Sequence, residues 1–223
     1  MESPPVALLA GATGAVGARL LELLLARQDG TRVLAVGRRP PSCEHARLES
    51  LQAELEGLPQ TLAGRNFDMA FCCLGTTMKR AGSKAAFRAV DLDGVTAFAR
   101  AARAGGADFF GLVSAAGADP GSRNFYLRTK GEAEARVEAL AFPSLAIMQP
   151  GLLRGPRQEF RLGERVGQVV APLADRLMLG PLARYRSVPI GIVAQALECT
   201  ARQQVPGSRR LDPADMETLA HGG

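Results

Sequence analysis

Tyr126 and Lys130 are the two residues of this sequence whose types and spacing are best suited to chemistry, and both lie in the segment FYLRTKGEAEA (125–135). Because they are four residues apart, they share one face of a helix. A free tyrosine hydroxyl has a pKa of about 10, and a neighbouring ammonium stabilises the phenolate and eases proton transfer near neutral pH. The pair therefore predicts a general acid or base with an assisting lysine. An ordinary aromatic and basic pair on a helix surface is the alternative.

Ser114 lies at the end of the strand expected in the apolar segment DFFGLVSA (108–115), which precedes the helix that carries Tyr126. Ligands of open α/β sheets bind at the carboxyl ends of the strands, so Ser114 is placed where its hydroxyl can polarise a substrate carbonyl. Ala115 and Ala116 follow it, and a shift of the register by one or two residues would remove that hydroxyl. Tyr126, Lys130 and Ser114 are the predicted catalytic residues.

Glycines recur at every third position in GATGAVG (11–17), namely at Gly11, Gly14 and Gly17. The triplet follows an apolar segment and opens a helical one. Small residues in that place let the backbone approach a pyrophosphate, while the helix N-terminus supplies N–H groups. The segment predicts a dinucleotide-binding loop, and a purely structural turn is the alternative.

The segment VGRRPP (36–41) stands about 20 residues beyond the glycines, where NAD-specific folds carry an acidic residue for the ribose 2′-hydroxyl. It has no acid there and offers Arg38 and Arg39 instead. A guanidinium pairs well with a 2′-phosphate, so the sequence predicts NADP (NADPH) as cofactor. A solvent-exposed basic turn is the alternative.

Apolar segments and helical patterns alternate along the chain, which predicts βαβ units and a parallel sheet covered on both faces. We expect an α/β fold with a Rossmann-type doubly wound sheet, as one domain over 1–223. Residues 1–151 form its cofactor-binding core, and 152–223 form a short C-terminal substrate-side extension. The expected strands are 6–11, 32–37, 47–52, 67–75, 108–115, 144–151 and 209–211. The expected helices are 14–27, a short one before 66, 83–104, 123–140 and 190–203.

Charge and composition narrow the class of partner. The net charge is +5, but the arginines are interspersed with acids, which favours a solvated basic surface over a nucleic-acid surface. The N-terminus does not read as a secretory signal, and no apolar segment approaches the length of a membrane span. The spacing of the cysteines is not that of a metal or disulfide motif, so we expect a cytoplasmic protein without a metal. Cys72 and Cys73 are interpreted as buried small hydrophobic residues rather than a redox switch.

Several longer segments, among them FCCLGTT (71–77), NFYLRTKGEAEARVE (124–138) and QPGLLRGPRQEFRLGE (149–164), carry a family resemblance over most of the chain. The sequence resembles the atypical short-chain dehydrogenase/reductases, in the branch of the oxidoreductase HIV Tat-interacting protein. The resemblance implies an NADPH-binding Rossmann fold in which Tyr126 and Lys130 transfer protons. It departs from relatives that act on sugar nucleotides at Asp91, where those relatives usually have an asparagine.

The resemblance also implies further cofactor contacts. It places Thr13, Gly14, Ala15 and Val16 at the pyrophosphate, Arg38 at the 2′-phosphate, and Leu74 and Gly75 on the adenosine side. Thr76 is a further predicted cofactor contact. It places Leu153 and Arg161 near the nicotinamide, with Pro150 and Gly151 at its carboxamide. Packing in the core is an equally good interpretation of Leu153. A surface position without a role in binding is an equally good interpretation of Arg161.

Two functions follow from these features. The first is an NADPH-dependent oxidoreductase that acts on a small carbonyl or alcohol. The second is an NADPH-binding regulatory or redox-sensing protein that acts through a protein partner with little turnover, since fold alone does not fix function. A homodimer is compatible with both. A sugar-nucleotide epimerase is a poorer hypothesis, because only about 70 residues follow Gly151 to form a substrate domain.

Overall fold

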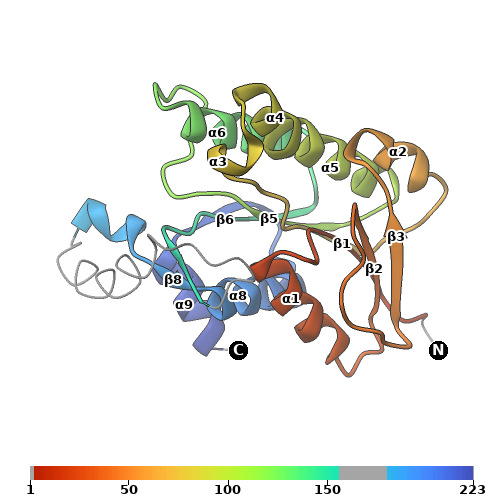
Figure 1. The fold of residues 1–223 in the computed structure, drawn as a ribbon. Coiled ribbons are helices and arrows are strands. Elements are labelled where there is room, and N and C mark those ends of the chain that lie inside the picture. The colour runs from red at the N-terminus through yellow and green to blue at the C-terminus, as the bar shows by residue number, and fades with distance from the viewer. Residues whose placement is uncertain (1–2, 156–179, 223) are drawn as a thin grey trace.

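A single parallel sheet of seven strands forms the centre of the molecule (Figure 1). The computed structural model describes residues 3–155 and 180–222. Every pair of neighbouring strands in this sheet is parallel, in the order β3-β2-β1-β4-β5-β6-β9. The strands are β1 (Val6–Ala10), β2 (Arg32–Gly37), β3 (Leu48–Gln52), β4 (Met69–Cys72), β5 (Phe109–Val113), β6 (Ser144–Met148) and β9 (Gly207–Leu211). The expected doubly wound α/β fold is confirmed.

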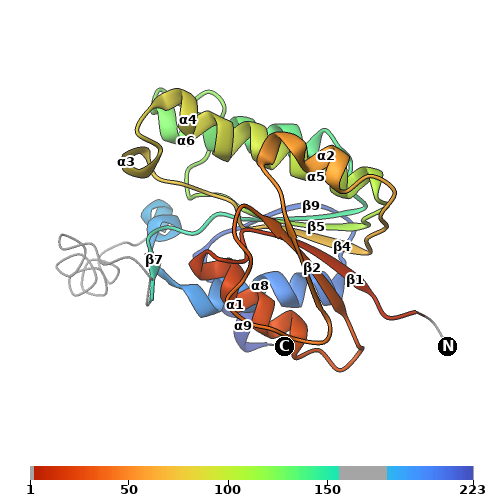
Figure 2. The same cartoon turned by 45° about the vertical axis from the view of Figure 1, so that its right-hand side comes forward.

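Helices cover both faces of the sheet (Figures 1 and 2). One face is covered by α1 (Ala15–Leu25), α8 (Ile190–Gln203) and α9 (Pro213–His221). The other is covered by α2 (Leu58–Thr61), α4 (Lys84–Arg88), α5 (Val95–Ala104) and α6 (Phe125–Glu138). Successive side chains of a strand point to opposite faces, so Leu9 belongs to the α1 and α8 core and Leu8 to the α5 core. Two apolar layers therefore hold the sheet rigid beneath the loops at its edge.

The single helix expected over 83–104 is divided in the structure. A π-helical segment, η2 (Ala89–Gly94), joins α4 to α5. A π-turn inserts extra backbone into a helix, which changes the direction of the side chains on it and often marks a functional site. Here the buried side chain of Asp91 lies on that segment.

Several short elements were not expected from the sequence. Helix α9 follows Asp212, which forms a capping box with Asp215, while Pro213 occupies the first turn. This D-P-A-D pattern is a helix-start signal, so α9 was predictable. Three further elements have a weaker signal in the sequence. They are helix α3 (Met78–Ala81) and the strands β7 (Leu153–Arg154) and β8 (Val188–Pro189), which form a small parallel sheet. The 3₁₀ helices η1 (Leu55–Gly57) and η3 (Gly180–Tyr185) complete the described elements.

The sheet reverses its strand order between β1 and β4, and this is where doubly wound folds bind their ligands. The chain leaves β1 toward β2 on one side, whereas β4, β5 and β6 follow one another on the other side. The glycine loop of 11–14 follows β1, and the segment 73–77 follows β4. Both loops consequently meet at the carboxyl edge of the sheet.

Candidate active site

The glycine loop is packed directly against the end of β4. Gly11 has φ of +83°, and a Cβ there would lie 2.5 Å from the Cys73 carbonyl oxygen. A Cβ on Gly17 would overlap the carbonyl oxygen of Gly11. Glycine is therefore required at both positions, by backbone conformation at Gly11 and by space at Gly17.

The N-terminus of α1 is left open to an anion. Gly14 is its N-cap residue, so no side chain caps it, and its first turn contains no acidic residue. The first N–H groups of a helix have no partner within the helix, and together with the helix dipole they attract negative charge. This arrangement fits a pyrophosphate.

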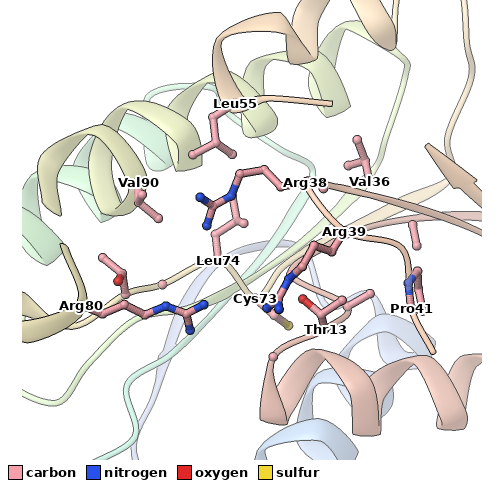
Figure 3. A pocket seen from close by; sticks show the side chains of 17 residues that line it. Thr13, Val36, Arg38, Arg39, Pro41, Leu55, Cys73, Leu74, Arg80 and Val90 are labelled. Atoms are coloured by element: carbon pink, nitrogen blue, oxygen red, sulfur yellow. The ribbon is translucent and has the colours of Figure 1, made fainter. Parts of the chain in front are cut away.

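A cavity of about 140 Å³ adjoins this loop (Figure 3). Arg38, Arg39 and Arg80 extend their guanidinium groups toward the space above Thr13 and Leu74. Arg38 and Arg39 are exposed, and neither has an ion-pair partner among residues 3–155 and 180–222. The cavity thus offers uncompensated positive charge where a 2′-phosphate is expected.

A larger cavity of about 730 Å³ continues from the smaller one and shares with it the glycine loop and the segment 73–76. Ser114, Tyr126, Lys130 and Leu153 line this larger cavity. The structure therefore brings the three predicted catalytic residues to the same cleft as the predicted dinucleotide loop.

Lys130 forms a buried ion pair with Asp91, with 2.7 Å between Nζ and Oδ1. Asp91 is fully buried, and its other oxygen accepts a hydrogen bond from the Thr76 amide at 2.9 Å. Burial by itself lowers the pKa of Lys130, but the Asp91 carboxylate and the nearby Tyr126 outweigh it and raise that pKa overall. Lys130 is consequently held in its charged form.

Helix α6 carries Tyr126, Lys130 and Glu134 at intervals of four residues, on one face. Asn124 starts the helix by accepting a hydrogen bond from the Leu127 amide at 3.2 Å. The half-buried Tyr126 ring packs against Phe87 of α4, with 5.5 Å between the ring centroids. Phe87 thus fixes the ring, while the α6 backbone sets its distance from Lys130.

Ser114 lines the cavity, but its hydroxyl donates a hydrogen bond to the Glu134 carboxylate. Glu134 is 1% exposed and also accepts hydrogen bonds from Gln149 Nε2 and Arg210 Nε, each at 3.0 Å. Burial disfavours the Arg210 charge, but Glu138 and Glu134 outweigh it and raise the pKa of Arg210. A serine hydroxyl has one proton, so the proton that would polarise a carbonyl is already used.

The predicted cofactor residues are distributed unevenly around the cleft. Ala15, Val16, Gly75 and Thr76 line the larger cavity with the residues named above. Three predicted residues line neither cavity, namely Gly17, Pro150 and Gly151. Gly17 packs against the Gly11 carbonyl, and Gly151 packs against the backbone of Tyr185 and Arg186. Pro150 is buried, and its carbonyl accepts a hydrogen bond from the Ala116 amide. Arg161 lies outside the described residues.

Three site residues had no predicted role at the sequence level. Asp91 is marked in the sequence only as a departure from a family pattern, and no local motif identifies Glu134 or Arg154. The partners of Asp91 and Glu134 lie on other elements, and no carboxylate of the described residues pairs with Arg154. Burial raises the pKa of the fully buried Cys72 thiol to about 12, so this thiol is not a reactive group. Burial also raises the pKa of Cys73, although its residue is only half-buried and lines both cavities.

The described residues contain neither a group of metal-binding side chains nor a membrane-spanning helix. In 3–155 and 180–222, no three His, Cys, Asp or Glu side chains are grouped in a way that would hold a metal ion. Within the same ranges, no helix has the length and apolar character required to cross a bilayer.

Comparison with known proteins agrees with this geometry. The sequence profile of the NAD(P)H-binding family matches residues 11–172. Protein HTATIP2 of Rattus norvegicus is 35% identical over 218 residues, which cover 96% of this chain and 87% of that protein. The structure of MoeE5 in complex with UDP-glucose and NAD superposes with a TM-score of 0.68 at 18% identity, covering 97% of this chain and 82% of the other. That structural likeness supports the fold.

One sequence-based expectation is wrong, namely the cytoplasmic location. Protein FMP52 of Coccidioides immitis, 32% identical over 76% of this chain and 74% of that protein, is named as mitochondrial, and so are further FMP52 relatives. The expectation rested on cysteine usage and on the lack of a secretory signal. Neither feature separates the cytosol from a mitochondrial compartment.

Proposed function

This chain belongs to the NAD(P)H-binding family, and we propose that it is an NADPH-dependent oxidoreductase acting on a small carbonyl or alcohol. One observation carries the proposal: the cleft that begins at the glycine loop also contains Tyr126 and Lys130. A loop suited to a dinucleotide and a pair suited to proton transfer therefore line the same cleft.

The residues that would hold the dinucleotide lie along the smaller cavity. The open N-terminus of α1 suits the pyrophosphate, and Arg38 and Arg39 suit a 2′-phosphate. When bound, NADPH supplies the hydride that the carbonyl carbon accepts. The protein's own part is to bind, to orient and to move the accompanying proton.

The proton would come from Tyr126. Its hydroxyl donates to the carbonyl oxygen as that oxygen gains negative charge, and in the reverse direction the phenolate accepts the proton of an alcohol. Lys130 stabilises the phenolate through its positive charge, and Asp91 keeps that lysine charged and fixed in place.

The first test measures the preference for NADPH over NADH, and the variant Arg38→Ala tests whether Arg38 is responsible for it. Titration with NADPH and with NADH, followed by nicotinamide fluorescence, should give the wild type a lower Kd for NADPH. Arg38→Ala should raise the NADPH Kd roughly tenfold and leave the NADH Kd unchanged, because a charge-assisted contact to phosphate is lost. Arg32→Ala is the control, since Arg32 is exposed at the opposite end of β2. Equal affinity for the two cofactors in the wild type would contradict the assignment of Arg38.

Proton transfer is tested with Tyr126→Phe. This change should lower kcat for aldehyde reduction about 100-fold or more, since it removes the proton donor, while the NADPH Kd stays within about twofold. Tyr185→Phe alters the other tyrosine, which packs against Gly117 outside the lining of the cleft, and should leave kcat unchanged. Full activity of Tyr126→Phe would show that another group supplies the proton.

A regulatory protein with little turnover is the second candidate, and two observations favour it. Asp91 compensates the charge of Lys130, so Lys130 stabilises a phenolate less than an isolated ammonium would. In addition, the Ser114 proton is directed to Glu134. The discriminating result is a wild-type protein that binds NADPH tightly and is stabilised by it, yet reduces none of a broad set of aldehydes and ketones.

The same relatives support a mitochondrial location for this chain. Fractionation of cells that express the tagged protein would test it, with enrichment in the mitochondrial fraction as the expected result.

A further inference from the structure

Arg154 lies on the wall of the larger cavity, on β7, next to Leu153. Its side chain is half-buried, and its Nε is fully buried without a hydrogen-bond partner. Among residues 3–155 and 180–222 no carboxylate pairs with its guanidinium. A buried donor of a charged group costs free energy when it is left unsatisfied, so an arginine that lines a cavity and has no carboxylate partner suits an anionic ligand.

Apart from Arg154, the charged residues that line only the larger cavity have partners of opposite charge. Four charged residues line the larger cavity without lining the smaller one, and three of them have partners. Arg19 pairs with Glu22 at 2.5 Å, and Lys130 pairs with Asp91. Arg154 is the fourth, and it supplies the one uncompensated charge of this set.

The lining around Arg154 is otherwise largely apolar. Val113, Leu153, Pro189 and Ile190 border the same cavity, and Tyr126 and Lys130 lie on its wall. Apolar walls with one fixed cation are suited to a small molecule with an apolar body and one acidic group. A guanidinium binds a carboxylate or a phosphate through parallel N–H bonds, which also orients the molecule that carries it.

We propose that Arg154 is a substrate-recognition residue, and that the substrate is a small carbonyl compound or alcohol bearing a carboxylate or phosphate group. This inference rests on the proposed oxidoreductase function and names the substrate class for it. Arg154 would hold the acidic group and so direct the carbonyl toward Tyr126.

The phosphates of the cofactor are the competing partner for Arg154. The smaller cavity already presents Arg38 and Arg39 where the 2′-phosphate is expected, and Arg154 does not line it. Arg154 lines the larger cavity, whose wall includes Tyr126 and Ser114 as well as Gly14 of the glycine loop. Its absence from the smaller cavity argues against a contact with the 2′-phosphate, and a contact with the pyrophosphate predicts a different effect on NADPH affinity from a contact with the substrate.

The test compares matched aldehydes on the NADPH complex. 4-Carboxybenzaldehyde and 4-formylphenyl phosphate are each compared with 4-methylbenzaldehyde, by calorimetric binding and by kcat/KM. The wild type should bind at least one anionic aldehyde roughly tenfold tighter than the neutral one. Arg154→Met, which keeps an unbranched side chain without the charge, should lose this preference. Arg154→Lys should keep part of it.

Two controls separate the possible outcomes. Arg19→Met removes a paired arginine from the same cavity and should leave the preference intact. The affinities for the anionic and the neutral aldehydes are also compared on protein without cofactor. This comparison shows whether Arg154 selects anions even if the protein does not bind NADPH. Thermal unfolding verifies that each variant is folded.

Three results would overturn the inference: no preference for either anionic aldehyde in the wild type, a preference that persists in Arg154→Met, or an NADPH Kd that rises in Arg154→Met as much as the aldehyde affinity falls. The last result would assign Arg154 to the cofactor phosphates. Failure of the proposed function has a different signature, because the wild type would then bind no NADPH or reduce no aldehyde of either kind.

Discussion

The two ends of the cleft are built on different principles. At the glycine-loop end, backbone approaches backbone: Gly11 and Gly17 lie within seven residues and pack against the Cys73 carbonyl and against each other. At the Tyr126 end, buried charged side chains meet from separate elements, as Lys130 of α6 and Asp91 of η2 do. The first end depends on the absence of side chains, and the second depends on their pairing.

This difference has a physical consequence. A larger side chain in the glycine loop destabilises it through steric overlap, which does not depend on pH. A buried ion pair is lost when either partner loses its charge, which does depend on pH. The two ends should therefore respond differently to substitution and to pH.

The largest effect is expected at the glycine-loop end. Gly11→Val places a β-branched side chain at φ of +83° and against the Cys73 carbonyl. We expect it to lower the free energy of unfolding by about 3 kcal/mol or more and to abolish NADPH binding. Thermal unfolding and NADPH titration measure both effects.

Gly191→Ala is the control, because Gly191 also lines the larger cavity and nothing lies within 4 Å of a Cβ at that position. It should leave the protein folded and able to bind NADPH. A Gly11→Val protein with wild-type stability and affinity would show that the loop does not require the close approach seen here.

The buried pair should give the second largest effect. Asp91→Asn keeps an acceptor for the Thr76 amide but leaves Lys130 buried without an anionic partner. We expect a loss of about 2 kcal/mol in the free energy of unfolding at pH 7. Asp93→Asn, which breaks an exposed pair with Arg136, should cost less than about 0.5 kcal/mol.

The pH dependence of this loss follows from the sign of the shift. The pKa of Lys130 is raised in the folded state above its ordinary value of 10.5. The pair therefore stabilises the fold fully below that value, and the stabilisation is lost as the pH rises through the folded-state pKa. In Asp91→Asn burial favours the neutral lysine. The gap in unfolding temperature between wild type and variant should be largest near pH 7 and narrow at alkaline pH; a gap independent of pH would mean that Lys130 is not charged in the fold.

The smallest effect is expected for Ser114→Ala. Removal of a group that stabilises a developing oxyanion typically lowers kcat by about 100-fold or more. Because the Ser114 proton is directed to Glu134, we expect less than about a tenfold decrease. Ser208→Ala removes a comparable hydrogen bond to Glu138 at the surface and should leave kcat unchanged. A loss of about 100-fold in Ser114→Ala would restore Ser114 as the residue that polarises the carbonyl.

Much of the fold could be predicted from the sequence, because apolar periodicity and turn residues are local signals. The expected strand 32–37 and the expected helix 190–203 agree with β2 and α8. The long helix 83–104 was predicted without its π-helical interruption, since composition does not reveal one extra residue in a turn.

The sequence by itself determined the glycine loop after β1 and the placement of Tyr126 and Lys130 on one face of α6, because spacing along the chain fixes both. Tertiary structure alone decided that Asp91 compensates Lys130, that Glu134 accepts the Ser114 proton and that Arg154 is left without a partner in the described chain. The physical reason is that a charge acts over a few ångströms in space. Which charges come that close is set by the order of the strands and not by their distance along the chain.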